Sequence, residues 1–496
     1  MKKIMLNRGE YADRVYGCWI GKNIGGTLGG PFEGRREILD VSGYTTPAGE
    51  PLPNDDLDLQ LVWLKAVIER GVQNITAQLL GEYWIDYIPP PWGEYGVAKM
   101  NLRSGLLPPV SGTYVNDILK NSNGAWIRSE IWACLFPGAP DAAIRLAYED
   151  ASVDHGVSEG MYAELFTAAV ESAAFVIGGV RELIRVGLSR IPAESLVARA
   201  VRIAEESYDG GLSWQEARAR VVNDSVPAIG WFQAPANVGF VIIGWLYGEG
   251  DFGKSLLIAT NCGDDTDCTA ATLGAILGIM RGAKRLPAEW TAPLGDRIAT
   301  IAIDRGKAKA FWPTTLAALT EMTVRQVAPA LVAFDVPVEL HEGKTDLSAL
   351  SGMDLCSASA AAEICARPPY AVRIDAVHSI VTLDYQRAPE LKTGEPFTVR
   401  LYIRSVAMDY CRYEIIWHLP PGIRVAEGSE TCISLLRHDI EKNLMNRGAG
   451  KVREPLTFTL IPESLAGGTI RSILEVRAPG RPNVGFIPLV FFQGAN

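Results

Sequence analysis

Residues 261–282 read NCGDDTDCTAATLGAILGIMRG, an acidic cluster followed directly by an apolar segment. Small residues recur in this segment at every fourth position, at Ala270, Gly274, Gly278 and Gly282. Such a spacing places them on one face of a helix, where they allow a neighbouring helix to approach closely. Because glycine lowers helix propensity, a helix of this kind is stable only when it is packed among others. The segment therefore predicts a helical domain built around a buried helix that begins near Asp265.

A second acidic cluster opens another predicted helix nearer the N-terminus. Asn54 is a favourable N-cap, and Asp55, Asp56 and Asp58 follow it. An apolar stripe then continues at helical spacing as far as Gly71. Further helical patterns occupy roughly 157–187, 193–207, 214–223, 236–247 and 252–260. Residues 1–335 are thus predicted to form one all-α domain.

The pattern changes after this domain. Residues 336–369 have little periodicity and include a run of serine and alanine at 357–362, which predicts a linker. From Tyr370 onward apolar and polar residues alternate, for example over 397–404, and turn residues separate the runs. Residues 370–496 are therefore predicted to form an Ig-like β-sandwich domain.

The composition excludes several classes of protein. The chain has 496 residues, of which 48% are hydrophobic and 21% charged, as in ordinary globular proteins. It contains no apolar run of about 18 residues, so we expect no membrane span. A net charge of -10 argues against a dedicated nucleic-acid binder. The N-terminus lacks the apolar core of a secretory signal, and the eight cysteines are scattered, so we expect a cytoplasmic protein with reduced thiols.

The two acidic clusters suggest a binding site for cations. Each could be an ordinary helix cap, since carboxylates in a first turn interact favourably with the helix dipole. One cap needs only one oxygen atom, however, and each cluster carries three carboxylates. If both helix starts face one cleft, bound cations relieve the repulsion, and oxygen ligands suit Mg²⁺, Mn²⁺ or Ca²⁺.

These motifs resemble those of the ADP-ribosylglycohydrolase family. Residues 263–268 are similar to the family pattern Gly-Gly-Asp-Thr-Asp-Thr, and residues 54–57 are similar to Ser/Thr-Asp-Asp-Thr. Residues 25–34 and 122–128 resemble two further blocks, and the order along the chain is that of the family. The resemblance covers about residues 10–290. It implies an all-α fold that holds two divalent cations, Mg²⁺ or Mn²⁺, with Ca²⁺ as a third choice.

The resemblance also implies roles for individual residues. Metal ligands are expected at Asn54, Asp55, Asp56, Asp265, Asp267 and Cys268. Two of these depart from the family pattern: Asn54 and Cys268 stand where hydroxyl residues are usual, and a thiol is a poor match for Mg²⁺. Whether either one coordinates is left open. Glu33, Asp55 and Asp56 are the candidates for proton transfer, whereas Gly26 stands where the family has an acid.

Substrate contacts are expected from three other segments. Trp92 and Tyr95 lie in a segment rich in proline and glycine, predicted to be non-helical, where they could stack on a base or ribose. The 122–128 block contributes Asn123, Gly124 and Arg128, and His155 is the only histidine before residue 341. The structural alternatives are a surface loop packed by its own aromatic residues for Trp92 and Tyr95, a helix-surface ion pair for Arg128, and a capping or core histidine for His155.

The resulting functional hypothesis is a metal-dependent glycosidase that hydrolyses the N- or O-glycosidic bond of an ADP-ribosylated protein or a small ribosyl substrate. One alternative is a glycosidase for another ribosyl or nucleoside-like compound. Another is a non-catalytic, crystallin-like or interaction protein. No nucleic-acid or membrane partner is expected, and a homo-oligomer is left open.

Overall fold

The computed structural model describes residues 2–224, 230–407, 410–435 and 455–494. It divides the chain into two compact units, each made of two stretches of sequence. Unit 1 comprises Met1–Lys99 and Val115–Ala366, and unit 2 comprises Met100–Tyr114 and Arg367–Asn496. Among the described helices, none has the length and hydrophobicity that a membrane span requires.

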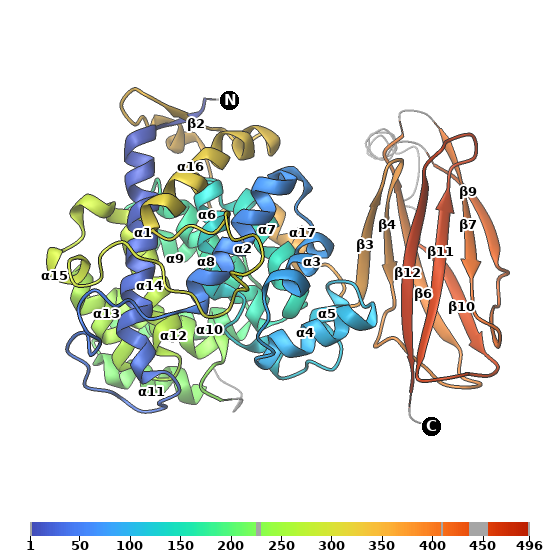
Figure 1. Ribbon diagram of the computed structural model, residues 1–496, viewed down its shortest axis with the longest axis horizontal. Coiled ribbons are helices and arrows are strands. Elements are labelled where there is room, and N and C mark those ends of the chain that lie inside the picture. The colour runs from blue at the N-terminus through green and yellow to red at the C-terminus, as the bar shows by residue number, and fades with distance from the viewer. Residues whose placement is uncertain (1, 225–229, 408–409, 436–454, 495–496) are drawn as a thin grey trace. The chain divides into compact units, whose positions relative to one another are not determined.

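Unit 1 is helical (Figure 1). Its helices are α1 (Arg8–Gly29), α2 (Asp55–Arg70), α3 (Ala77–Tyr87), the first part of α4 (Gly93–Ser104), α6 (Glu130–Leu135), α7 (Pro140–Asp154), α8 (Glu159–Ala174), α9 (Val180–Leu188), α10 (Leu196–Asp209), α11 (Trp214–Asp224), α12 (Ala234–Tyr247), α13 (Phe252–Asn261), α14 (Thr266–Arg281), α15 (Ala288–Thr291), α16 (Leu316–Ala333) and α17 (Ser359–Cys365). A short parallel pair, β1 (Ile4–Asn7) and β2 (Val338–His341), joins the two ends of this unit.

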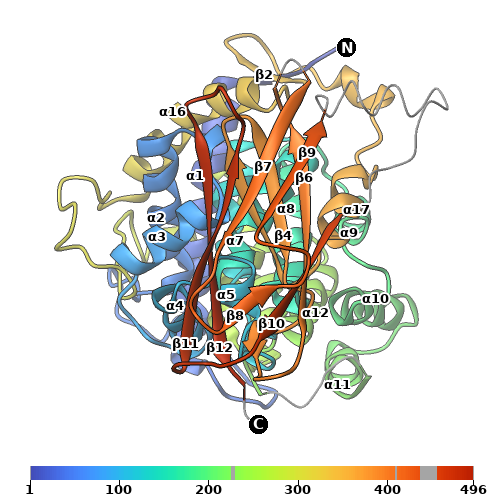
Figure 2. The same ribbon diagram turned by 90° about the vertical axis from the view of Figure 1, so that its right-hand side faces the viewer.

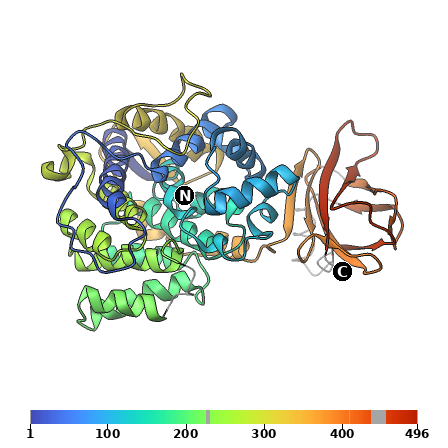
Figure 3. The same cartoon turned by 60° about the horizontal axis from the view of Figure 1, so that its bottom comes forward.

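Helices α1 and α14 lie side by side in unit 1 (Figure 1), which Figure 3 shows from another direction. Their backbones touch along a row of small residues. A Cβ atom on Gly21 would lie only 1.9 Å from the carbonyl oxygen of Gly274, and one on Gly278 would lie 2.0 Å from that of Gly17. The predicted small face of α14 is therefore matched by small residues on α1. This close approach brings the start of α14 next to the end of α1.

The structure differs from the predicted helices in two places. The segment 157–187 forms two helices, α8 and α9, because the chain leaves the helical path over residues 175–179. The segment around Trp92 and Tyr95, predicted to be non-helical, contains the start of α4 at Gly93. Its three prolines precede the helix, so they do not interrupt it.

The segment predicted to be a linker is largely structured. Residues 336–366 belong to unit 1 and contain β2 and α17, the latter formed by the run of serine and alanine. Strand β2 is held by its parallel pairing with β1, from Ile4 with Val338 to Asn7 with His341. This partner lies more than 300 residues away in the sequence, so local periodicity could not indicate it.

Unit 2 contains two five-stranded sheets, seen in Figure 2. The first has the order β3-β4-β6-β10-β8 and the second the order β5-β12-β11-β7-β9. The strands are β3 (Ala371–Ala376), β4 (Ser379–Asp384), β5 (Glu390–Leu391), β6 (Phe397–Ser405), β7 (Cys411–His418), β8 (Ile423–Val425), β9 (Glu430–Leu435), β10 (Leu456–Pro462), β11 (Thr469–Arg477) and β12 (Val484–Gln493). Described neighbours pair antiparallel except β5 with β12. The predicted architecture, helices followed by a β-sandwich, is confirmed.

A piece of the N-terminal half of the chain also belongs to unit 2. Residues 100–114 include the end of α4 and the short helix α5 (Val110–Thr113). Leu106 and Val110 are buried in the same core as residues from both sheets. The ring of Tyr114 stacks on that of Phe492, with 4.9 Å between their centroids. The predicted boundaries at 335 and 370 do not include this inserted segment.

Candidate metal centre

Acidic side chains gather where α2 and α14 begin. Asn54 caps α2, since its Oδ1 accepts a hydrogen bond of 2.7 Å from the backbone amide of Asp56. Asp265 occupies the N-cap position of α14, and its backbone amide donates to Asn237 Oδ1 at 3.1 Å. Both helices thus start at the places that the sequence predicts. We call the group Glu33, Asp55, Asp56, Asp265, Asp267 and Cys268 the acidic cluster.

Two sets of three side chains in this cluster are close enough to share an ion. Asp56, Asp267 and Cys268 each offer one ligand atom, and these atoms lie within 4.8 Å of one another. The same holds for Glu33, Asp265 and Asp267. Asp267 therefore belongs to both sets. The arrangement offers two neighbouring ion positions that share one carboxylate.

Several oxygens of the cluster lack any hydrogen-bond partner. Asp56 Oδ2, Asp265 Oδ1 and Asp267 Oδ1 are all buried and unpartnered. An ionised carboxylate that is buried without a partner is strongly unfavourable. Lys22 provides only partial compensation, because its Nζ lies 3.9 Å from Asp56 Oδ2. The residues present therefore fit divalent cations, which prefer carboxylate oxygens as ligands.

The loop that carries Glu33 is fastened to the start of α14. Backbone hydrogen bonds of 2.9 Å run from Gly34 to Asp264 and from Asp264 to Arg35. Gly263 has a positive φ of 74°, and a Cβ there would lie 2.2 Å from the carbonyl oxygen of Glu37. Glycine is therefore required for this contact. The result is that Glu33, an exposed residue, presents its carboxyl group to the cluster.

Burial and mutual repulsion disturb the acidity of these groups. Burial, reinforced by the charge of Asp267, raises the pKa of Asp55 to about 6. The same two causes raise the pKa of Asp265 well above its usual range. Partial desolvation of the Glu33 carboxyl group, together with Asp267 and Asp55, raises its pKa to about 8. Without a cation, the cluster therefore tends to retain protons.

Residues from the 122–128 block and from α4 hold the cluster in place. Asn123 Nδ2 donates to Asp265 Oδ2 at 2.7 Å, and the hydroxyl of Tyr95 donates to Asp55 Oδ2 at 3.1 Å. A Cβ on Gly124 would lie 2.2 Å from Glu94 Oε1 and 2.9 Å from the Tyr95 ring, so this turn packs closely against side chains of α4. The structure thus brings Asn123, Gly124 and Tyr95 to the predicted site.

Arg128 and His155 are instead engaged inside the protein. Arg128 is fully buried, where its guanidinium donates to Asp150 at 2.9 Å, to Asp154 at 2.7 Å and to the carbonyl oxygen of Gly124. The imidazole of His155 lies between Asp154 and Ser122, with 3.0 Å to the carboxylate and 3.1 Å to the hydroxyl. Arg128 thus forms a buried ion pair, not the helix-surface ion pair of the structural alternative, and His155 has the contacts of a core histidine. The substrate contacts expected of both residues stay a prediction.

Two other positions, one acidic and one aromatic, have distinct surroundings. Asp58 faces away from the cluster, because its Oδ2 accepts the backbone amides of Ile301 and Ala302, each at 2.6 Å. Trp92 is 43% exposed, and its ring centroid lies 6.4 Å from that of Tyr95. Trp92 thus presents an aromatic surface beside a residue that contacts the cluster.

Sequence reasoning missed Lys22, Glu94 and Asn237. Lys22 is buried and donates to Glu130 at 2.6 Å, next to Asp56. Asn237 orients the backbone of Asp265, and Glu94 lies against Gly124. Asn237 is a polar residue within the otherwise apolar helix α12, and this contrast was a usable signal. Helix α1 contains several other polar residues, so Lys22 gave no such contrast. Glu94 was hidden in a segment that resembled a loop.

Comparison with known proteins shows the family of the chain. Residues 7–320, more than half of the chain, match the ADP-ribosylglycohydrolase family. The chain therefore belongs to this family of glycohydrolases. A solved structure described as an ADP-ribosylglycohydrolase-related protein complex is 20% identical, with 64% of this chain and 99% of that chain covered and a TM-score of 0.41. No curated protein matches.

Proposed function

We propose that the protein is a divalent-metal-dependent hydrolase that cleaves the N- or O-glycosidic bond of an ADP-ribosylated protein or small molecule. The observation that carries this proposal is the set of buried, unpartnered carboxylate oxygens at the starts of α2 and α14. The family membership supports glycoside hydrolysis as the type of reaction. The eight free thiols support a reducing, cytoplasmic location.

The residues of the cluster divide into holding and reacting groups. Asp56, Asp265, Asp267 and Cys268 would hold the cations, with Asp55 beside them. Two Mg²⁺ or Mn²⁺ ions held by these residues would supply positive charge for binding ribose hydroxyls and would make a water molecule more acidic. Asn123 keeps the Asp265 carboxylate in one orientation through its 2.7 Å hydrogen bond. Such partners of metal ligands preserve the geometry that catalysis needs.

Proton transfer is proposed for Glu33 and Asp55. Glu33 lies on a loop fastened beside α14, and its raised pKa suits a group that takes a proton from an attacking water near neutral pH. Asp55 is oriented by the Tyr95 hydroxyl. Negative carboxylates around the ribose would also stabilise the positive charge that develops on the sugar as the bond breaks. The exposed ring of Trp92 is proposed to stack on the base or ribose.

The test is a product screen with the full chain. ADP-ribosyl-arginine, ADP-ribosyl-serine, O-acetyl-ADP-ribose and a panel of nucleosides are incubated with Mg²⁺ or Mn²⁺, and with a chelator. We expect release of ADP-ribose that the chelator abolishes. Cleavage of nucleosides alone would identify the alternative glycosidase. No cleavage and no metal binding would support the non-catalytic alternative.

Two substitutions connect the activity to the cluster. Asp56→Asn and Asp265→Asn are each expected to lower the rate by about 100-fold or more, because removing a single electrostatic contact in an active site costs that much. Asp117→Asn is the matched control, since its side chain is 89% exposed and pairs only with Lys120 in the described contacts. Circular dichroism checks that all three variants keep their helical content. Full activity of either cluster variant would refute the assignment.

A further inference from the structure

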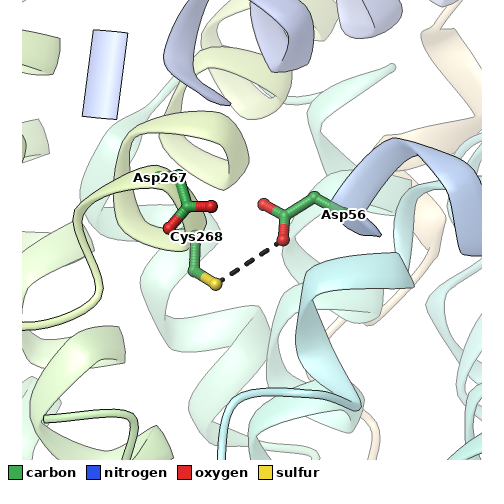
Figure 4. Close-up of side chains that lie close together, drawn as sticks. All are labelled: Asp56, Asp267 and Cys268. Carbon is green, nitrogen blue, oxygen red and sulfur yellow. Dashed lines mark hydrogen bonds between the residues drawn. The ribbon is translucent and has the colours of Figure 1, made fainter. Parts of the chain in front are cut away.

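Cys268 differs chemically from every other member of the acidic cluster. It follows Asp267 in the first turn of α14, and both side chains face Asp56 at the start of α2 (Figure 4). Its thiol donates a hydrogen bond of 3.5 Å to Asp56 Oδ1. The other ligand candidates in the two sets of three offer carboxylate oxygens. The two ion positions are therefore unequal, one with oxygen ligands only and one with a sulfur atom.

The position next to the sulfur atom is incomplete without a cation. Asp56 and Asp267 are 0% and 8% exposed, and Asp56 Oδ2 and Asp267 Oδ1 have no hydrogen-bond partner. These unpartnered oxygens belong to the same set of three as the thiol, within 4.8 Å. Lys22 Nζ, 3.9 Å from Asp56 Oδ2, compensates these charges only in part. The buried carboxylates, and not the cysteine alone, therefore indicate that a further positive charge is bound here.

Ligand chemistry then indicates which cation is preferred. Mg²⁺ prefers oxygen ligands, whereas thiolate sulfur favours softer ions such as Zn²⁺, Fe²⁺ or Co²⁺. We infer that Cys268 is a metal ligand that gives the Asp56–Asp267–Cys268 position a preference for a thiophilic divalent cation over Mg²⁺. On ligation the thiol loses its proton to solvent, and the sulfur–metal bond replaces the S–H bond. The other position, at Asp265 and Asp267 beside Glu33, has oxygen ligands only and keeps its preference for a hard cation.

This inference rests on the proposed metal centre, and it adds that one of its ligands is a thiolate that sets the metal preference. A thiol that only donates a hydrogen bond to Asp56 would leave the metal preference to the carboxylates. Co²⁺ distinguishes the two cases, because a cobalt–thiolate bond produces a charge-transfer absorption band that oxygen ligands do not. The experiment therefore uses Co²⁺ as the probe and absorption as the readout, independent of activity.

The metal-free full chain is titrated with Co²⁺ under anaerobic conditions, with a reductant that contains no thiol. We expect the near-ultraviolet charge-transfer band in the parent protein and its loss in Cys268→Ser. Calorimetry with Zn²⁺ and Mg²⁺ should show that this variant loses affinity for Zn²⁺ on the order of tenfold or more, since even indirect partners of metal ligands contribute that much. Its affinity for Mg²⁺ should be retained.

Cys262→Ser is the matched control. Cys262 is another buried thiol near the start of α14, but it belongs to neither set of candidate ligands. The band should persist in this variant. Binding of Co²⁺ by the parent protein without a charge-transfer band would overturn the inference and leave the metal centre intact. If Co²⁺, Zn²⁺ and Mg²⁺ all fail to bind, both the inference and the proposed function are wrong.

Discussion

Individual carboxyl groups in unit 1 differ in how their charge is compensated. Asp150 and Asp154 share the buried guanidinium of Arg128. Asp58 receives two backbone amides. The acidic cluster has no comparable partner among the described residues, apart from Lys22 near Asp56. Uncompensated charge at the cluster is therefore a property of residue placement and not of the overall composition.

This difference predicts how pH affects stabilisation by metal. The folded-state pKa values of Asp55 and Glu33, about 6 and about 8, lie above their usual values of 3.8 and 4.5. The metal-free folded state therefore binds more protons than the unfolded chain, and these groups destabilise it as the pH rises through this range. Cations that replace the protons should stabilise the protein more at pH about 8 than at about 5.

The measurement is the shift in melting temperature on adding Mn²⁺ to chelated protein at both pH values. The double variant Asp55→Asn, Glu33→Gln serves as the control, because its two replaced groups no longer titrate. In this variant the difference between the two shifts should shrink. Equal shifts at both pH values in the parent protein would contradict the prediction.

At the scale of elements, the packing of α1 against α14 positions the cluster. The two helices meet at small residues, so that the backbone carbonyl of one faces the Cα of the other. Gly25 lies against Ala270, and Gly29 lies against Thr266 in the first turn of α14. The hydroxyl of Thr266 also donates to the carbonyl oxygen of Gly29 at 2.8 Å. The contact therefore extends to the end of α14 that carries Asp265, Asp267 and Cys268.

Enlarging a residue in this contact should separate the helices. In Gly21→Ala, the new Cβ would lie 1.9 Å from the carbonyl oxygen of Gly274, a backbone atom that cannot rotate away. We expect a loss of about 1–3 kcal/mol or more in the free energy of unfolding, typical of overpacking. Chemical denaturation measures it, and metal affinity should fall as well. Gly43→Ala is the control, because nothing lies within 4 Å of the position of its Cβ atom. If Gly21→Ala is as stable as the parent protein, the argument is refuted.

At the scale of the whole molecule, the chain is divided into units that are each discontinuous in sequence. The chain passes from the helical unit into unit 2 at residue 100 and returns to the helical unit after residue 114. Residues 100–114 contribute to the core of unit 2. Leu106 and Val110 are almost completely buried in that core. The β-sandwich and the inserted segment therefore depend on each other, although they are far apart in the sequence.

A shortened chain tests this dependence. A protein that ends at Ala366 lacks the strands that cover Leu106 and Val110, so we expect exposed apolar surface and aggregation. Size-exclusion chromatography and binding of a hydrophobic dye measure these effects. The same truncation with Leu106→Ser and Val110→Ser should bind less dye and aggregate less. A truncated chain that is monodisperse without these substitutions would show that the inserted segment does not need unit 2.

Much of this protein can be predicted from local patterns. The starts of α2 and α14 follow from N-cap residues and apolar stripes, because helix capping and periodicity involve neighbours within a few residues. The change to alternating residues after Tyr370 likewise indicates strands. The acidic motifs identified the family, since residue type and order along the chain are sufficient for that.

Tertiary structure decided which of these side chains meet. Asp58 and Asp267 stand in similar acidic clusters, but only Asp267 joins both sets of candidate ligands, whereas Asp58 binds a loop over 240 residues away. The sequence motifs suggested that Arg128 and His155 contact the substrate. In the folded chain both residues are buried, and both pair with Asp154. The insertion of residues 100–114 into unit 2 likewise depends on contacts between segments far apart in the sequence. The physical reason is that helix starts and strand patterns depend on local interactions, whereas the surroundings of a side chain depend on elements that folding brings from elsewhere in the chain.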